Sequence, residues 1–148
     1  MPKIYLSPST QDWNMYVTGS GSEEYNMNLL ADALVPYLLS NGIQYQRNRP
    51  EMTAGSSIRE ANQGEYDLYL ALHSNAAPEG RYGEERGIIA FYYPGSVGGQ
   101  RAAELIAQEL GERVFPAEQL PVVKRVIHTT ADFEYADNLV FSPGAVEQ

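Results

Sequence analysis

The sequence contains no cysteine, which excludes disulfide bonds, thiolate metal sites and a cysteine nucleophile. Basic residues are also scarce, since 10 Lys and Arg stand against 19 Asp and Glu for a net charge of −9. Because no basic run could follow a phosphate backbone, nucleic acid is not an expected partner. No apolar run is long enough to span a bilayer, and the first residues lack the apolar segment of a signal peptide. We therefore expect no membrane association, and a cytoplasmic chain as encoded.

The remaining composition, 43% hydrophobic residues in a chain of 148, is typical of a globular domain with its own core. Strand-like and helical patterns alternate along it, which predicts an α/β fold with an open, mostly parallel sheet flanked by helices. Ser22 is the expected cap of the first long helix, Gly42 follows its end, and Pro36 should kink it or unpair one carbonyl. The predicted strands are 3–7, 43–48, 66–73 and 88–94, and the predicted helices are 22–42, a short one within 50–64, and 98–114.

One of only two histidines, His73, stands where the apolar strand 66–73 ends. The loop after the first strand and the start of the first helix, with Glu23 and Glu24, belong to the same expected sheet edge, where α/β proteins collect ligands. An imidazole with a carboxylate is the beginning of a zinc site. The same residues are also explained by a hydrogen-bonded structural histidine and by glutamates that favour a helix N-terminus, and spacing alone leaves both interpretations open.

Several segments match one family in order. The runs "KIYLSPST", "EEYNMNLLADAL", "GIQYQRN", "SSIREAN", "DLYLALHSNAAPEG" and "RGIIAFYYPGS" resemble, over about residues 3–110, the zinc-dependent N-acetylmuramoyl-L-alanine amidases called amidase type 3. The resemblance implies zinc bound by Glu24 and His73, with Arg59, Asn62 and Asn75 shaping the substrate edge. It implies peptidoglycan or a muramyl peptide as the substrate, cleaved at the amide between muramic acid and L-alanine. Such a chain would act at the cell wall after release by another route.

Two parts of the family pattern are missing. The loop after the first strand reads "SPSTQDWN", where the family has a zinc histidine, and Thr10 stands nearest to that position. Gln11 is the candidate for a weak third ligand, with Asp12 as another oxygen donor. No apolar strand carries the late catalytic glutamate that acts as general base. We therefore expect weak zinc binding and impaired hydrolysis.

The last part of the chain follows a different pattern. "LPVVKRVIHTTADFEYADNLVFSPGAV" resembles an N-terminal segment of the precorrin-8X methylmutases of cobalamin biosynthesis. This resemblance divides the chain into an amidase-like domain, 1–112, and a tail, 113–148, although the similarity could begin inside the helix before it. It implies a proton-handling role for His128, although we favour the interpretation of His128 as a residue near a helix C-terminus. If the chain hydrolyses its substrate, Glu134 is the first candidate for the general base.

Three functions compete on these grounds: an impaired zinc-dependent amidase, a peptidoglycan-binding domain without catalysis, and a fragment of a corrin-pathway methylmutase. The sequence leaves the oligomeric state open. In the tail, 120–128 has a helical pattern and 138–142, "NLVFS", a strand pattern. We expect "NLVFS" either to pair with an open sheet edge or to stay loosely attached, and we favour loose attachment. Limited proteolysis should then cut first between Glu112 and Gln119.

Overall fold

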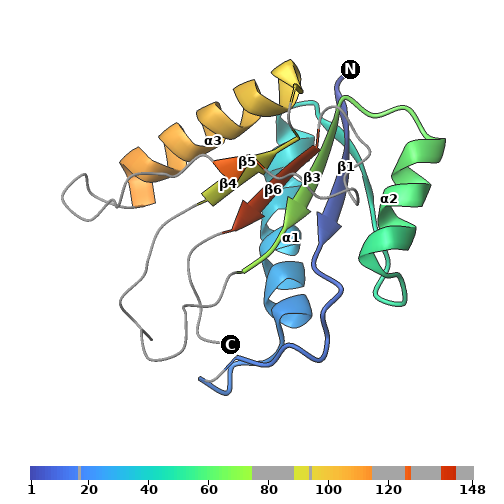
Figure 1. Ribbon diagram of the computed structural model, residues 1–148, viewed down its shortest axis with the longest axis vertical. Helices are drawn as coiled ribbons and strands as arrows, with labels where there is room; N and C mark the ends of the chain where they lie inside the picture. Colours follow the sequence, from blue (N-terminus) through green and yellow to red (C-terminus); the bar gives the residue numbers. More distant parts are fainter. Residues whose placement is uncertain (17, 75–88, 94, 115–125, 128–137, 143–148) are drawn as a thin grey trace.

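The computed structural model describes residues 1–16, 18–74, 89–93, 95–114, 126–127 and 138–142. Within these residues the chain forms one six-stranded sheet in the order β2-β1-β3-β6-β4-β5, flanked by helices (Figure 1). All paired strands are parallel except β4 and β6, so the predicted α/β fold with an open, mostly parallel sheet is confirmed. The strands are β1 (Lys3–Pro8), β2 (Gln44–Arg47), β3 (Leu68–Leu72), β4 (Ile89–Tyr92), β5 (Val126–Ile127) and β6 (Asn138–Ser142); the helices are α1 (Glu23–Ser40), α2 (Ala54–Gln63) and α3 (Val97–Val114).

The helices cover the two faces of the sheet unequally. Alternate residues of a strand point to opposite faces, so β1 and β3 each supply both cores. On one face α1 and α3 pack over aliphatic side chains of β1 and β3. On the other face α2 packs over Tyr5, Tyr69 and Ala71 through Ile58 and Ala61. The Tyr5 and Tyr69 rings are stacked, with centroids 5.4 Å apart.

Helix α1 begins and ends as the sequence predicts. The Ser22 side chain accepts a hydrogen bond from the Tyr25 amide, which satisfies one of the unpaired amides of the first turn. At the other end Gly42 has φ +71°, a left-handed conformation that glycine adopts without steric cost. The helix continues through Pro36, which is exposed to solvent.

The tail corrects one expectation. Residues 138–142 form β6, which pairs in parallel with β3 and antiparallel with β4, in the interior of the sheet. The loose attachment that we favoured for this run is therefore wrong, and the pairing alternative holds. Without β6, the facing edges of β3 and β4 would carry unpaired backbone groups. The helical expectation for 120–128 is also wrong at Val126–Ile127, which form β5 beside β4; its other residues lie outside the described ones.

The division into domains at residue 112 stays a prediction. Helix α3 runs to Val114, so the expected cleavage region begins inside a helix and continues into residues 115–119, which lie outside the described part. Within the described residues, no helix is long and apolar enough to cross a membrane.

Candidate functional site

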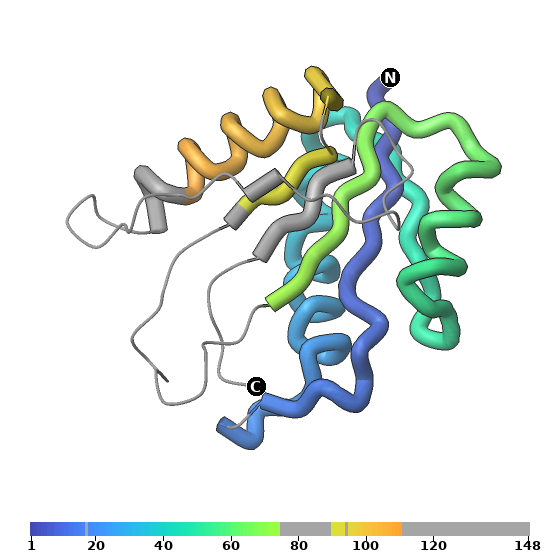
Figure 2. Tube along the Cα trace, in the orientation of Figure 1, coloured from blue at the N-terminus to red at the C-terminus, as the bar shows by residue number. Residues whose placement is uncertain are grey.

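Three segments meet at the carboxyl ends of β1 and β3. His73 follows β3 directly, and the Ser9 amide beyond β1 donates to the Leu72 carbonyl at 2.9 Å, which holds the two strand ends together. The chain then passes from β1 below the sheet to the start of α1 (Figure 2). The first residue of that helix, Glu23, donates its backbone N–H to the Asn14 carbonyl at 2.8 Å. The edge predicted to collect a ligand is therefore assembled from β1, β3 and α1.

His73 and Glu23 form a close pair at this edge. Nδ1 of His73 lies 2.9 Å from Oε1 of Glu23, and the Ser74 amide donates to the same oxygen at 3.3 Å. The Glu23 side chain is only 2% exposed, while the His73 side chain is 27% exposed. Hydrogen-bond donors must offset the cost of burying the Glu23 carboxylate. Its position in the first turn of α1 also places it in the favourable field of the helix dipole.

Asn14 connects this pair to the loop after β1. Its side-chain amide nitrogen donates to Oε2 of Glu23 at 2.9 Å and to Oε1 of Gln11 at 3.1 Å. The Gln11 oxygen and the Glu23 carboxylate thus converge on one nitrogen. The structure therefore brings Gln11, the predicted weak third ligand, into one cluster with Glu23 and His73.

The geometry fixes the role of each imidazole nitrogen. An ionised carboxylate can only accept, so this contact favours the tautomer of His73 that carries the proton on Nδ1. Nε2 is then the nitrogen that can accept a proton or bind a metal ion. A carboxylate that orients a histidine through its second nitrogen is a common support for a metal ligand or a base.

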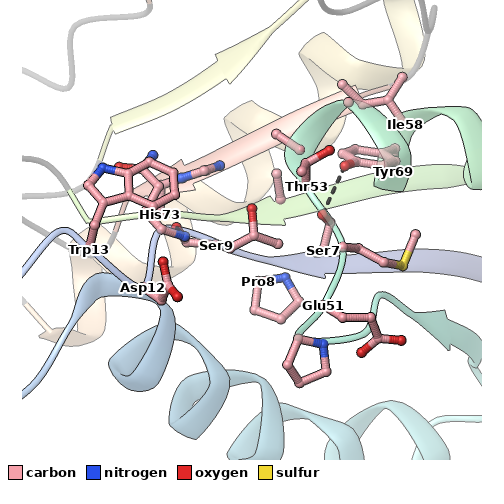
Figure 3. A pocket seen from close by; sticks show the side chains of 17 residues that line it. Ser7, Pro8, Ser9, Asp12, Trp13, Glu51, Thr53, Ile58, Tyr69 and His73 are labelled. Atoms are coloured by element: carbon pink, nitrogen blue, oxygen red, sulfur yellow. Dashed lines mark hydrogen bonds between the residues drawn. The ribbon is translucent and has the colours of Figure 1, made fainter.

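A groove of about 710 Å³ starts at His73 and extends across β1 toward α2 (Figure 3). In the figure Asp12, Trp13 and His73 lie at one end, and Tyr69 and Ile58 lie at the other. Its walls come from the β1 end and the following loop, residues 7–13, from the β2–α2 connection and first turn of α2, residues 50–55, and from Ile58, Tyr69, Ala71 and His73. The groove is thus open to a ligand larger than a metal ion.

A buried hydrogen-bond network supports the groove from below. The Asn48 side-chain amide donates to Ser7 Oγ at 3.2 Å, to the Pro8 carbonyl at 3.0 Å and to Ser57 Oγ at 3.2 Å. The Tyr69 hydroxyl donates to Ser7 Oγ at 2.8 Å, the bond drawn in Figure 3. Asn48 therefore ties the end of β1 to the start of α2, where it fixes two walls of the groove.

Tyr16 supports the chain directly after His73. Its hydroxyl donates to Ser74 Oγ at 2.6 Å, and both residues are buried. Burial raises the pKa of Tyr16 above its ordinary value, although the hydrogen bond to Ser74 opposes part of this shift. Tyr16 thus stays protonated and holds the side chain of Ser74, the residue whose backbone amide contacts Glu23.

The structure places the predicted site residues unequally. It brings Glu23, not Glu24, onto His73; the backbone amide of Glu24 donates to the Gln11 carbonyl at 3.3 Å. Arg59 and Asn62 are exposed on α2 and are absent from the described lining of the groove. The remaining predicted site residues, Asn75, His128 and Glu134, lie outside the described residues.

Glu23 is the residue in contact with His73 that the sequence analysis did not select as a ligand. The family pattern predicts Glu24 as the ligand, because Glu24 stands four residues before the pair Asn28 and Leu29. The helical phase contains the better signal, because Met27 and Ala31 are buried and Glu23 precedes them by one and two turns. Glu23 therefore lies on the buried face of α1, and Glu24 lies beside it.

The donor set fits a metal ion only in part. A catalytic zinc ion takes three protein ligands and one water, and it favours imidazole, thiolate and carboxylate. Among the described residues, no group of three His, Cys, Asp or Glu side chains is arranged to hold a metal. His73 Nε2 is one suitable donor and the Gln11 amide oxygen is a weaker one, while the Glu23 carboxylate supports His73 through Nδ1.

Solved structures with the same fold are N-acetylmuramoyl-L-alanine amidases. Ami1 from Mycobacterium smegmatis aligns with a TM-score of 0.75 at 10% identity, over 97% of this chain and 82% of that one. Ami1 from Mycobacterium abscessus gives 0.72 at 12% identity, over 97% and 84% of the two chains. AmiC2 of Nostoc punctiforme gives 0.70 at 13% identity, over 97% and 79%. At these identities the likeness establishes the amidase fold, which confirms the resemblance drawn from sequence.

The carboxyl-terminal third matches a different family. The family model for precorrin-8X methylmutase, CbiC, matches residues 99–148. A cobalt-precorrin-8 methylmutase from Priestia megaterium is 45% identical over 47 residues, which are 32% of this chain and 21% of that protein. The chain thus spans about a fifth of the length of this curated relative. The match begins inside α3, ahead of residue 113, so the two similarities overlap within one helix.

Proposed function

We propose that this chain is an amidase-fold domain that binds muramyl peptides of peptidoglycan in the groove at His73 and hydrolyses them poorly. One observation carries the proposal: the groove starts at an imidazole that a buried carboxylate orients. An open groove suits a polymeric substrate better than an enclosed cavity does. The amidase fold of the solved neighbours supports the same substrate class.

Zinc is the proposed cofactor, held weakly by His73, which the adjacent carboxylate orients. When bound, zinc would polarise the scissile carbonyl and activate water at neutral pH. The residues of the chain have separate tasks. Glu23 fixes the tautomer and orientation of His73, Asn14 holds the Glu23 carboxylate, and Gln11 offers an oxygen on the same side. In this proposal Glu23 replaces Glu24 as the carboxylate that works with His73.

Impaired hydrolysis follows from what the site provides. The described residues do not offer the three strong donors of a catalytic zinc site, and their sequence contains no counterpart of the late glutamate of the family. A positioned general base alone contributes roughly 10²–10⁴-fold to the rate. We therefore expect release of the peptide from a muramyl peptide at least about a hundredfold below that of a complete amidase.

The deciding experiment combines binding and turnover on the same protein. Calorimetry with muramyl dipeptide, with and without zinc, should give saturable binding that His73→Ala weakens. Mass spectrometry of the same samples should find little hydrolysis. Absence of any muramyl-peptide binding would refute the proposal, whereas rapid hydrolysis would refute the impairment and point to Glu134 as the missing base.

A binding domain without catalysis is the second candidate, and the incomplete donor set favours it. Metal content after dialysis separates the two, because a binding domain should retain muramyl-peptide affinity with no zinc. The corrin-pathway alternative rests on the match over 99–148. A corrin needs an extended pocket, and the chain spans only 21% of the methylmutase it matches, so we expect no binding in a corrin titration.

A further inference from the structure

Trp13 stands at the rim of the groove with 73% of its surface exposed. It is the single tryptophan of the chain, and it lies at the His73 end of the groove in Figure 3. Tryptophan combines a large apolar face with one N–H donor, and it is favoured where a ligand is apolar on one side and wet on the other. An exposed indole beside an oriented imidazole therefore indicates a ligand-binding surface.

The charge of the groove limits what this ligand can be. The residues that line it include two carboxylates, Asp12 and Glu51, and no lysine or arginine. Arg49 pairs with Glu51 at 3.1 Å and also with Glu60, so one arginine serves two carboxylates. Asp12 adds a further negative charge, and the rim is therefore negative on balance. An anionic ligand would be repelled here, while a neutral ligand with many hydroxyls finds acceptors in the carboxylates and partners in Thr10 and Thr53.

We propose that Trp13 is a stacking platform for a neutral N-acetylhexosamine ring, with Asp12 accepting hydrogen bonds from the sugar hydroxyls. This inference rests on the proposed function and identifies which part of the substrate occupies the Trp13 end. The C–H face of a pyranose ring is apolar and matches the face of an indole, whereas its equatorial hydroxyls point outward to polar groups.

The chemistry of a muramyl peptide agrees with this placement. The scissile amide is attached to the sugar through a lactyl group, so a sugar ring must lie close to any residue that acts on that amide. Trp13 lies at the end of the groove where His73 stands. The peptide stem carries free carboxylates, which disfavour Asp12, and it would extend toward Tyr69 and Ile58, past Glu51, which is paired with Arg49.

The single tryptophan makes the platform directly measurable. Tryptophan fluorescence of the full chain should change saturably with chitotriose and with muramyl dipeptide, and it should not respond to the free dipeptide L-alanyl-D-isoglutamine. In calorimetry Trp13→Ala should weaken chitotriose binding about tenfold, while Trp13→Phe, which keeps an aromatic face, should retain most of it. Tyr37→Ala is the matched control, because Tyr37 is an aromatic residue 70% exposed on α1 and outside the groove.

The outcomes separate the platform from the proposed function. If muramyl dipeptide binds in calorimetry but Trp13→Ala leaves its affinity and that of chitotriose unchanged, the platform is wrong and the proposed function stands. If chitotriose binds through Trp13 while muramyl dipeptide does not bind, the platform stands and the proposed function falls. A fluorescence response to the free dipeptide without a response to chitotriose would overturn the platform, and so would no binding of any of these ligands.

Discussion

Oε1 of Glu23 lies 2.9 Å from Nδ1 of His73, although the two residues are 50 positions apart in the chain. The carboxylate is almost completely buried, and three donors surround it: the imidazole, the Ser74 amide and the Asn14 side chain. The buried carboxylate depends on these donors, because removing them would leave a buried charge without compensation. The imidazole it orients remains partly exposed at the groove, which makes His73 the residue that can meet a ligand.

Zinc binding should depend on Glu23 and not on Glu24. With an incomplete donor set we expect micromolar or weaker affinity, and loss of an orienting partner weakens a metal site by roughly 10–100-fold. His73→Ala should abolish binding, Glu23→Gln should weaken it by about that factor, and Glu24→Gln should leave it unchanged. Isothermal titration with zinc measures all three. A larger loss of affinity in Glu24→Gln than in Glu23→Gln would return the assignment to the residue predicted from sequence.

Gln11→His should tighten zinc binding. The Gln11 oxygen and Glu23 share the Asn14 amide nitrogen, so an imidazole at residue 11 starts on the correct side of the site. Replacing an amide oxygen by an imidazole gives zinc a donor it prefers, and we expect at least about a tenfold gain in affinity. Thr10→His is the control, since residue 10 stands nearest to the family histidine by sequence. A gain with Thr10→His alone would show that the loop presents Thr10, not Gln11, to the metal.

Asn48→Ala should destabilise the fold more than a typical surface change. Asn48 is 7% exposed and donates to three acceptors that join β1 to α2. Its loss leaves buried acceptors unsatisfied, which costs about 1–3 kcal/mol of unfolding free energy. Urea denaturation measures this cost, and Asn62→Ala on the exposed face of α2 should stay within about 0.5 kcal/mol of the parent. Equal losses of unfolding free energy in Asn48→Ala and Asn62→Ala would show that the Asn48 network does not stabilise the groove.

Stability should fall as pH rises above 10. Burial, followed by the hydrogen bond to Glu60, raises the pKa of Tyr5, and burial raises the pKa of Tyr16. Because the unfolded chain loses these protons at a lower pH than the folded one, the unfolding free energy is unaffected below pH 10 and declines above it. Urea denaturation from pH 8 to 11 should show this decline, and Tyr16→Phe should reduce its slope. An unchanged slope in Tyr16→Phe would place the alkaline sensitivity elsewhere.

The sequence predicts the elements of the fold well where the signals are local. Ser22 and Gly42 mark the two ends of α1 by their own chemistry, and the short apolar run before His73 is typical of a buried strand. Two features depend on tertiary structure and are not visible locally. The choice between Glu23 and Glu24 is decided by which face of α1 packs on the sheet. The place of β6 is decided by the gap between β3 and β4, whose backbone groups need a partner that the amidase-like part of the sequence does not provide.

The pairing of β6 leads to the last prediction, which concerns the tail. A site for a specific protease can be inserted between Pro116 and Pro121, in the connection from α3 to β5. Since β6 pairs with β3 on one side and with β4 on the other, the two fragments should stay together after cleavage and co-elute in size-exclusion chromatography. A strand in the middle of a sheet is held by backbone hydrogen bonds along both edges, so its release would expose two unpaired edges at once.

Leu139→Pro is the matched test, because proline removes a backbone donor from an interior strand and should release the tail fragment or prevent folding. Separation of the parent fragments under native conditions would restore the loosely attached tail and leave the sheet interrupted between β3 and β4.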